Sequence, residues 1–212
     1  TCSFFMPDNQ HILYASTHEA NSACPAPPVS KDGKYLWAIY PEFDIYMADL
    51  SGKIVKKLTD VPGYDAEAVV SPDGKKIVWR ASRPSTPAEV AEYKSLLAEG
   101  LVAPTKMEVF IADADGSNAK QITNLGQANW APNFTPDGKH IIFCSNHEYK
   151  YGFPFNMYLM DLEGNNIEKI SRDKGFDAFP MFSPDGKRIM FSSNRNNGGS
   201  RDTNLFVADW VY

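Results

Sequence analysis

The sequence predicts an all-β protein, a β-propeller made of four-stranded antiparallel blades. Two observations carry this prediction: one turn phrase recurs along the chain, and each copy leads into the same series of short apolar runs. The phrase is Pro-Asp in its first copy and Ser/Thr-Pro-Asp-Gly in the others, at residues 7–8, 71–74, 135–138 and 183–186. Four short strands per repeat, separated by turn residues, are typical of a propeller blade.

The strand units follow in the same order in each repeat. The second strand is expected in ILYASTH, IVWRASR, IIFCSNH and IMFSSNR, from residues 12, 77, 141 and 189. The third is expected in FDIYMAD, MEVFIAD, FNMYLMD and TNLFVAD, from residues 43, 107, 155 and 203. Three repeats add a fourth strand, in KIVKKLT, NAKQIT and NIEKIS, from residues 53, 118 and 166. We therefore expect one domain over residues 1–212, with blades at about 1–60, 61–124, 125–173 and 174–212.

Turn chemistry supports the same interpretation independently of the repeat. In Ser-Pro-Asp-Gly, proline presets φ, aspartate bonds to nearby backbone, and glycine takes the conformation that other residues avoid. A second turn, Asp-x-x-Gly at residues 49–52, 113–116 and 161–164, joins the third strand to the fourth. Such acidic turns resemble calcium loops, but the downstream glutamate that a calcium loop needs is missing. The sequence therefore predicts hairpin turns here.

Composition limits the classes of partner. The chain has 212 residues, 43% of them hydrophobic and 13% aromatic, which suits packed sheets. Its net charge of −5 argues against a nucleic-acid partner, because phosphate binding needs a basic surface. No apolar run approaches the ~18 residues that a membrane span requires. No signal-peptide pattern is present, so any export signal is expected to be removed or to lie upstream of Thr1.

Two insertions interrupt the repeats after the second strand of the first two blades. The first, residues 19–35, is rich in Pro and Ser. The second, residues 84–105, predicts one helix with Thr86 as N-cap, Pro87 at its first position and Glu89 completing a capping box. Its apolar stripe is expected to comprise Val90, Tyr93, Leu97 and Leu101. Both insertions should emerge on the same rim, either as binding or lid elements or as cover for an exposed blade edge.

The repeat units SPDGKKIVWRASR, TPDGKHIIFCSNH and SPDGKRIMFSSNR resemble those of TolB-type propellers, a periplasmic, WD-like family. The resemblance implies an extracytoplasmic location and a protein or peptide partner, as in a cell-envelope complex. Related propellers usually have six blades, whereas four repeats are visible here and the last ends after its third strand. We therefore expect a piece of a larger propeller, with a self-contained four-bladed ring as the alternative.

The cysteines bear on the cellular compartment. Cys2 begins the first strand and Cys24 lies in the insertion that returns beside that blade, so we expect a disulfide that contributes about 3 kcal/mol. Such a bond fits an oxidising, extracytoplasmic setting. Cys144 lies within a second strand and is expected to be a small buried thiol without reactivity.

Two sets of equivalent positions could form a ring of polar residues near one rim. The end of the second strand carries a cationic or imidazole side chain, and the position just before the first strand carries a carboxylate or amide. We call these seven residues the ring positions: His18, Arg83, His147, Arg195, Asp65, Asn129 and Asp177. They could pair with one another and lock the blades, or they could bind a charged peptide, a sugar acid or a metal.

Catalytic motifs are otherwise missing from the sequence. It has no Gly-x-Ser-x-Gly elbow, no His-Glu-x-x-His, no Cys-x-x-Cys and no glycine-rich phosphate loop. His18 and His147 alone would make a poor metal site, so we predict no metal and no cofactor. We expect a non-catalytic propeller that binds a protein or peptide through its insertion-bearing rim. The resemblance also leaves an enzyme open, because propeller lyases acting on oligogalacturonate use histidines with a metal, and prolyl oligopeptidases and tricorn-like proteases use propellers to admit substrate.

Overall fold

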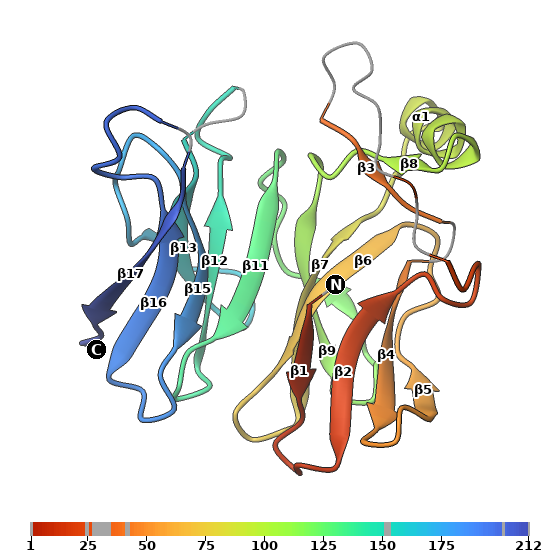
Figure 1. The fold of residues 1–212 in the computed structure, drawn as a ribbon, viewed down its shortest axis with the longest axis horizontal. Coiled ribbons are helices and arrows are strands. Elements are labelled where there is room, and N and C mark those ends of the chain that lie inside the picture. The colour runs from red at the N-terminus through yellow and green to blue at the C-terminus, as the bar shows by residue number, and fades with distance from the viewer. Residues whose placement is uncertain are drawn as a thin grey trace.

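Antiparallel sheets stand side by side in chain order, each forming one blade (Figure 1). The computed structural model describes residues 2–23, 26, 35–40, 43–150, 154–200 and 202–211. The first blade comprises β1 (Ser3–Phe5), β2 (His11–Ser16), β4 (Asp44–Asp49) and β5 (Ile54–Lys57). The second comprises β6 (Tyr64–Val70), β7 (Lys76–Ser82), β9 (Glu108–Asp113) and β10 (Lys120–Gln121).

The last two blades repeat this order, but the final one has fewer strands. The third blade comprises β11 (Asn129–Phe134), β12 (His140–Ser145), β13 (Asn156–Asp161) and β14 (Glu168–Lys169). The fourth comprises β15 (Asp177–Phe182), β16 (Arg188–Ser193) and β17 (Asn204–Asp209). Every pairing within a blade is antiparallel. The all-β propeller architecture with four repeats is confirmed.

The predicted turns form through the hydrogen bonds that their side chains offer. Ser71 Oγ donates to Asp73 and accepts from the Lys76 amide, and the Gly74 amide donates to the Ser71 carbonyl. Gly74 has φ +73°, the left-handed conformation for which glycine is suited. The same bonds recur in the third and fourth blades around Thr135 and Ser183. These local bonds explain why the phrase recurs in nearly the same form.

Backbone hydrogen bonds join each blade to the next at its inner edge. The amides of Asp65, Asn129 and Asp177 donate to carbonyls that precede the third strand of the previous blade, at 3.2, 3.2 and 2.9 Å. These acceptors belong to Phe43, Met107 and Phe155, which are all buried. Apolar side chains fill the seam between the first two blades, among them Leu13, Ile45, Ala66 and Ile77. The blades are therefore held both by a packed core and by a regular backbone link.

The second insertion forms the predicted helix, α1 (Pro87–Ala98), with Thr86 as N-cap and both bonds of the capping box to Glu89. The prediction that Leu101 continues the apolar stripe is wrong. The helix ends at Ala98, and Leu101 lies in β8 (Leu101–Val102). This residue is held in a short strand instead, because β8 pairs antiparallel with β3 (Trp37–Ala38), which follows the first insertion.

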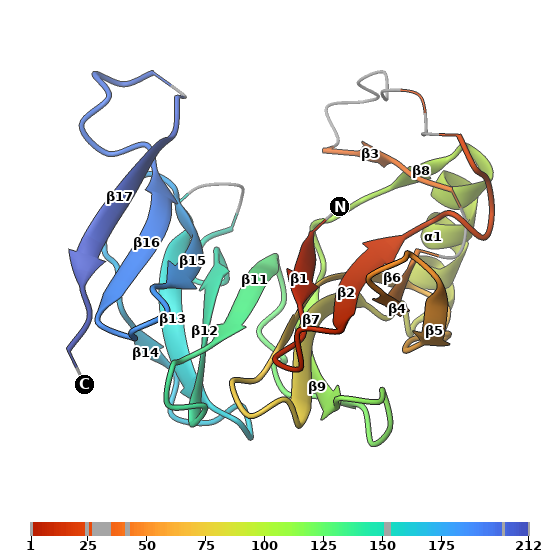
Figure 2. The same ribbon diagram turned by 60° about the horizontal axis from the view of Figure 1, so that its bottom comes forward.

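The second insertion thus meets the segment that follows the first one, and α1, β3 and β8 lie together at one end of the molecule in both ribbon views (Figure 1, Figure 2). Tyr93 anchors the helix through its hydroxyl, which donates to the Gly63 carbonyl at 3.0 Å. Most of the first insertion, residues 24–25 and 27–34, lies outside the described residues.

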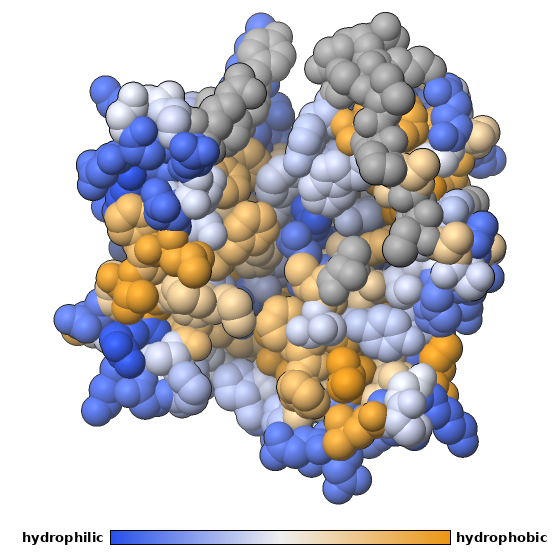
Figure 3. Space-filling model, in the orientation of Figure 1, coloured by the Kyte–Doolittle hydropathy of each residue, from blue (hydrophilic) through white to orange (hydrophobic). Residues whose placement is uncertain are grey.

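The fourth blade has an open outer edge in the part of the chain that the structure describes. No fourth strand pairs with β17 there, as the sequence predicts. The sheet face is apolar and open to solvent, with Leu205 68% and Val207 61% exposed, beside Met181 and Met190. Figure 3 shows this apolar patch over β16 and β17. No described helix is long and apolar enough to span a membrane.

Candidate functional site

The first strand of each of the last three blades carries a bulge in the same place. Glu67, Ala131 and Phe179 have φ values of 57°, 47° and 57°, and the strand register shifts beside each of them. A bulge bends the strand and redirects a side chain. Because β11 contacts both β6 and β15, the three bulged strands lie next to one another in series and shape the centre of the molecule.

An aromatic cleft of about 910 Å³ opens at this centre, at the end that carries the insertions. Six of its lining rings form a continuous series, which we call the aromatic ladder. Successive ring centroids lie 5.8, 6.2, 4.8, 5.6 and 5.9 Å apart. In order, the ladder consists of Tyr35, Trp37, Trp130, Phe155, Phe176 and Phe179. It therefore reaches from the first insertion to the fourth blade.

The two ends of the ladder are accessible to a ligand. Tyr35 is 54% exposed and Phe179 is 44% exposed, whereas Trp130 and Phe155 between them are buried. Polar side chains interleave with the rings, including Gln127 and Lys150. Figure 3 shows the molecule hollowed between the insertion-bearing half and the last blade. A long apolar floor with scattered polar groups is suited to an extended ligand.

The ring positions of the second and fourth blades form ion pairs within their own blade. Arg195 Nη2 donates to both carboxylate oxygens of Asp177, each at 2.8 Å. Arg83 Nη1 donates to Asp65 Oδ2 at 3.0 Å, and its Nη2 donates to the other oxygen. Both carboxylates are fully buried. Burial raises the pKa of Asp65, against the opposing effect of Arg83.

The third blade links its two ring positions through a serine. Ser145 Oγ donates to Asn129 Oδ1 at 2.7 Å and lies 2.9 Å from His147 Nδ1. Burial lowers the pKa of His147, so the imidazole is held toward its neutral form. In the first blade, His18 packs edge-on against Tyr46 at 4.6 Å, and its ring nitrogens are buried without a hydrogen-bond partner among the described residues.

The sequence prediction needs one correction of position. Asp65, Asn129 and Asp177 were expected just before the first strand, but they are paired residues inside it, at its start. The inter-blade backbone bond described above draws these residues into the sheet. None of the seven ring positions lines the aromatic cleft. Whether they bind a ligand stays a prediction.

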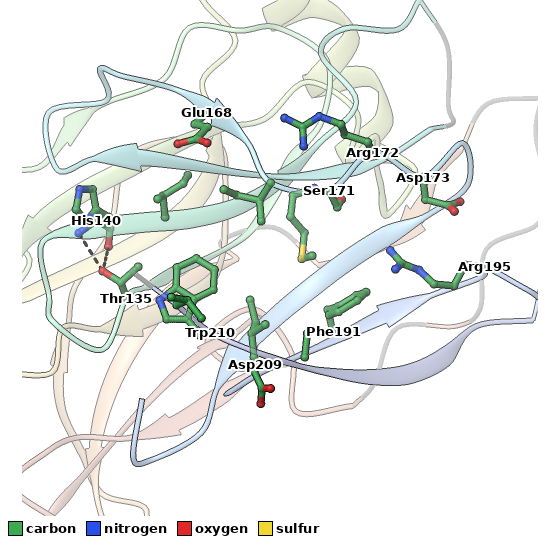
Figure 4. A pocket seen from close by; sticks show the side chains of 16 residues that line it. Thr135, His140, Glu168, Ser171, Arg172, Asp173, Phe191, Arg195, Asp209 and Trp210 are labelled. Atoms are coloured by element: carbon green, nitrogen blue, oxygen red, sulfur yellow. Dashed lines mark hydrogen bonds between the residues drawn. The ribbon is translucent and has the colours of Figure 1, made fainter. Parts of the chain in front are cut away.

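Two of the ring positions border other cavities. Arg83 lines a cavity of about 380 Å³ between α1 and the second blade, together with Glu89 and Tyr93. Arg195 lines one of about 920 Å³ between the third and fourth blades, where Phe191, Trp210 and Arg172 are also found (Figure 4).

The larger of these cavities lies at a seam that is covered in the other blades. Gly116 of the second blade lies against Leu58 of the first, and Gly164 of the third lies against Ile122 of the second. The equivalent residue of the third blade, Ile170, lines the open cavity instead. Among the described residues, no turn of the fourth blade packs against Ile170 as Gly116 and Gly164 pack at the other two seams.

The cysteines are only partly described. Cys2 is exposed and has no disulfide partner among the described residues, while Cys24 lies outside them, so their pairing stays a prediction. Cys144 is buried, as expected, and its Sγ lies 3.1 Å from the Trp130 carbonyl oxygen. Burial raises the pKa of this thiol to about 12. The described residues contain no group of three His, Cys, Asp or Glu side chains that could hold a metal.

Sequence reasoning missed the aromatic ladder. Its members belong to different strand positions in different repeats, so no single repeat position carries an aromatic signal. Phe43, Met107 and Phe155 precede the third strand in equivalent places, but only Phe155 joins the ladder. The available signal was the excess of aromatic residues in the first strands of the last two blades and after the first insertion.

Comparisons with known proteins agree with this architecture. A family model described as the TolB beta propeller domain matches residues 102–202. An uncharacterized protein of Agrobacterium fabrum, Atu1656, is 26% identical over 103 residues, or 49% of this chain and 28% of that protein. Dipeptidyl-peptidase 5 of Porphyromonas gingivalis is 35% identical over 81 residues, or 38% of this chain and 10% of the peptidase. The aligned part thus spans less than a third of either relative.

Solved structures share the fold over almost the whole chain. TolB of Acinetobacter baumannii matches with a TM-score of 0.65 and 21% identity, over 98% of this chain and 41% of that one. A protein assigned as TolB from Agrobacterium tumefaciens matches with a TM-score of 0.64 and 19% identity, over 98% of this chain and 60% of that one. An oligogalacturonate lyase in complex with manganese matches with a TM-score of 0.57 and 19% identity, over 98% of this chain and 49% of that one. Residues 102–202 match the model of the TolB beta propeller domain, and almost the whole chain shares the β-propeller fold of the two TolB structures.

Proposed function

We propose that this propeller is a non-catalytic, extracytoplasmic module that binds a protein or peptide segment at its insertion-bearing end. The aromatic ladder is the observation that carries the proposal. It offers six rings in series along a cleft of about 910 Å³, with exposed rings at both ends. Aromatic-lined grooves suit extended, proline-rich or apolar peptide segments, because rings give large contact areas at little cost in side-chain entropy.

The likeness to TolB proteins supports a periplasmic location and a role in a cell-envelope complex. The net charge of −5 supports a protein partner over a nucleic acid. The cleft lies beside both insertions, so the segments that distinguish this chain from a plain repeat border the proposed binding surface.

Selection of peptides from a random display library against the immobilised 212-residue chain tests the proposal. We expect enrichment of a shared motif that contains aromatic or proline residues. Binding of the selected peptides should fall when either exposed end of the ladder is removed, in Tyr35→Ala or Phe179→Ala. Phe5→Ala is the matched control, because Phe5 is 69% exposed and lies outside the cleft. Selected peptides that bind both ladder variants and the control equally well would place recognition elsewhere.

A second candidate function is the propeller of a peptidase. The 35% identity to dipeptidyl-peptidase 5 over 81 residues favours it. In that case the propeller would control access to a catalytic domain carried by the full-length gene product. Hydrolysis of dipeptidyl chromogenic substrates by that product, and not by the 212-residue chain, would support this alternative.

A further inference from the structure

One blade carries a buried ion pair at a place where the other repeats have small or apolar residues. Arg80 Nη2 lies 3.0 Å from Glu67 Oε1, with the two side chains 2% and 13% exposed. The residues equivalent to Arg80 are Ala15, Cys144 and Ser192, and the bulge residues equivalent to Glu67 include Ala131 and Phe179. Those blades form without such a pair, and a buried ion pair gains little stability over apolar packing. The blade architecture therefore does not require these charges.

The guanidinium of Arg80 has donors that nothing in the described structure uses. Its Nε and Nη1 atoms are buried and have no hydrogen-bond partner among the described residues. Buried polar groups in proteins are nearly always paired, and a guanidinium offers five N–H donors. Three aromatic rings hold the cation in place, since its central carbon lies 5.0 Å from the Trp37 ring, 5.2 Å from Trp130 and 5.6 Å from Tyr64. The charge is thus held in position while hydrogen bonds remain available.

Arg80 lines a cavity of about 370 Å³. Arg80 and Glu67 supply its charged groups, and Ile39 and Val102 supply part of its apolar wall. Trp37 and Glu67 line both this cavity and the aromatic cleft, so the two spaces adjoin. A ligand that occupies the cleft could therefore place one group beside Arg80.

We propose that this cavity binds a neutral amide group, whose carbonyl oxygen accepts from Arg80 and whose N–H donates to Glu67. The charge balance selects an amide over a carboxylate. Glu67 already neutralises Arg80, so a carboxylate would bring a second negative charge next to Glu67 among aromatic walls, where desolvation is costly. This inference rests on the proposed function, because the amide group would belong to the peptide segment that is bound in the aromatic cleft.

Side-chain NMR of the 212-residue chain tests the site without a known partner. The probes are N-methylacetamide and, at matched ionic strength, sodium acetate, and the readout is the Nε–H signal of Arg80. We expect N-methylacetamide to cause a saturable shift and acetate a smaller one. The corresponding signals of Arg83 and Arg195 are internal controls, because both guanidinium groups are paired with carboxylates of their own blade. An Arg80 signal that N-methylacetamide leaves unmoved, or that acetate shifts more, overturns the proposal.

Glu67→Gln provides a second test with an opposite expected outcome. The glutamine keeps an oxygen that can accept from the Ala131 amide, which Glu67 Oε2 contacts at 2.7 Å. It removes the negative charge, so the cavity becomes cationic and should prefer acetate to N-methylacetamide. An unchanged preference in the folded variant contradicts the charge argument. The probe titration and the peptide selection can fail independently, so a wrong ligand class at Arg80 is distinguishable from a wrong function for the cleft.

Discussion

At the residue scale, the ring positions show how one place in a repeat accommodates either a cation or an imidazole. Each side chain at the end of the second strand lies against an aromatic ring of the third strand. The contacts are His18 with Tyr46, Arg83 with Phe110, His147 with Tyr158 and Arg195 with Phe206. The first-strand residue varies to match: an aspartate faces each arginine, and an asparagine accompanies His147. Because a buried carboxylate needs a cation, the two positions change together.

Arg195→Ala should lower the free energy of unfolding by about 3 kcal/mol, because it leaves Asp177 buried without its cation. His147→Ala is the matched control at the equivalent position. It removes one hydrogen-bond partner of Ser145 and no charge, so about 1 kcal/mol is expected. Urea denaturation of both variants measures the difference. Equal losses in the two would contradict a structural role for the ion pair.

At the element scale, the Asp-x-x-Gly turns need glycine for two reasons. The turn itself requires a left-handed φ, and in some blades the neighbouring blade leaves no room for a side chain. Gly52, Gly116 and Gly164 all have left-handed φ values, between 84° and 87°. A Cβ on Gly52 would meet nothing, whereas one on Gly164 would overlap the carbonyl of Ile122 in the neighbouring blade. The same turn is thus a simple hairpin in one blade and a packing contact in another.

Gly164→Ala should therefore be more destabilising than Gly52→Ala. The left-handed conformation alone accounts for about 1 kcal/mol at Gly52. At Gly164 the clash with the Ile122 backbone should add about 2 kcal/mol, because overpacking forces the blades apart. Chemical denaturation of the two variants checks this, and a loss at Gly52 as large as at Gly164 would show that only turn conformation matters.

The capping box of α1 makes the start of this helix sensitive to acid. Hydrogen bonds from the Thr86 and Ser85 amides lower the pKa of Glu89 from 4.5 to about 2. Because the folded pKa is depressed, this stabilisation is complete above pH 4.5 and is lost as the pH falls toward 2. Protection of the first-turn amides of α1 against hydrogen exchange, taken relative to the intrinsic exchange rate at each pH, should decrease over that range. Glu89→Gln should remove the pH dependence, and a Glu89 carboxyl that titrates near its ordinary value by NMR would contradict the account.

At the scale of the whole molecule, the fourth blade is less protected than the other three. Each of those has four paired strands, whereas β17 has no partner along its outer edge within the described residues. Its sheet face exposes Leu205 and Val207 beside Met190. Exposed edges and apolar faces recruit further strands or sheets. This is the surface through which we expect the 212-residue chain to associate.

Sedimentation of the 212-residue chain should therefore reveal concentration-dependent association. Val207→Lys should weaken it, because a charge on the apolar face opposes burial. Val61→Lys is the control, since Val61 is similarly exposed, at 53%, but lies in a loop of the second blade. A chain that stays monomeric at every concentration, or a control that weakens association equally, would contradict a role for this blade.

The features that the sequence determined by itself are those whose interactions are local. The Pro-Asp-Gly turns and the capping box at Thr86 both rest on hydrogen bonds between residues a few positions apart. Their side chains therefore reveal them directly in the printed sequence. The helix end was missed because Leu101 pairs with Ala38, a residue far away along the chain.

Only the tertiary structure decided which residues come together at the centre of the molecule. The bulges depend on how each first strand pairs with its neighbour, and a shift of register by one residue changes which side chains face the axis. Only that geometry assembles the aromatic ladder from separate blades and brings Glu67 to both Arg80 and the Ala131 amide. The repeat pattern cannot reveal these contacts, because it records what the blades share, whereas the cleft is built from the positions at which they differ.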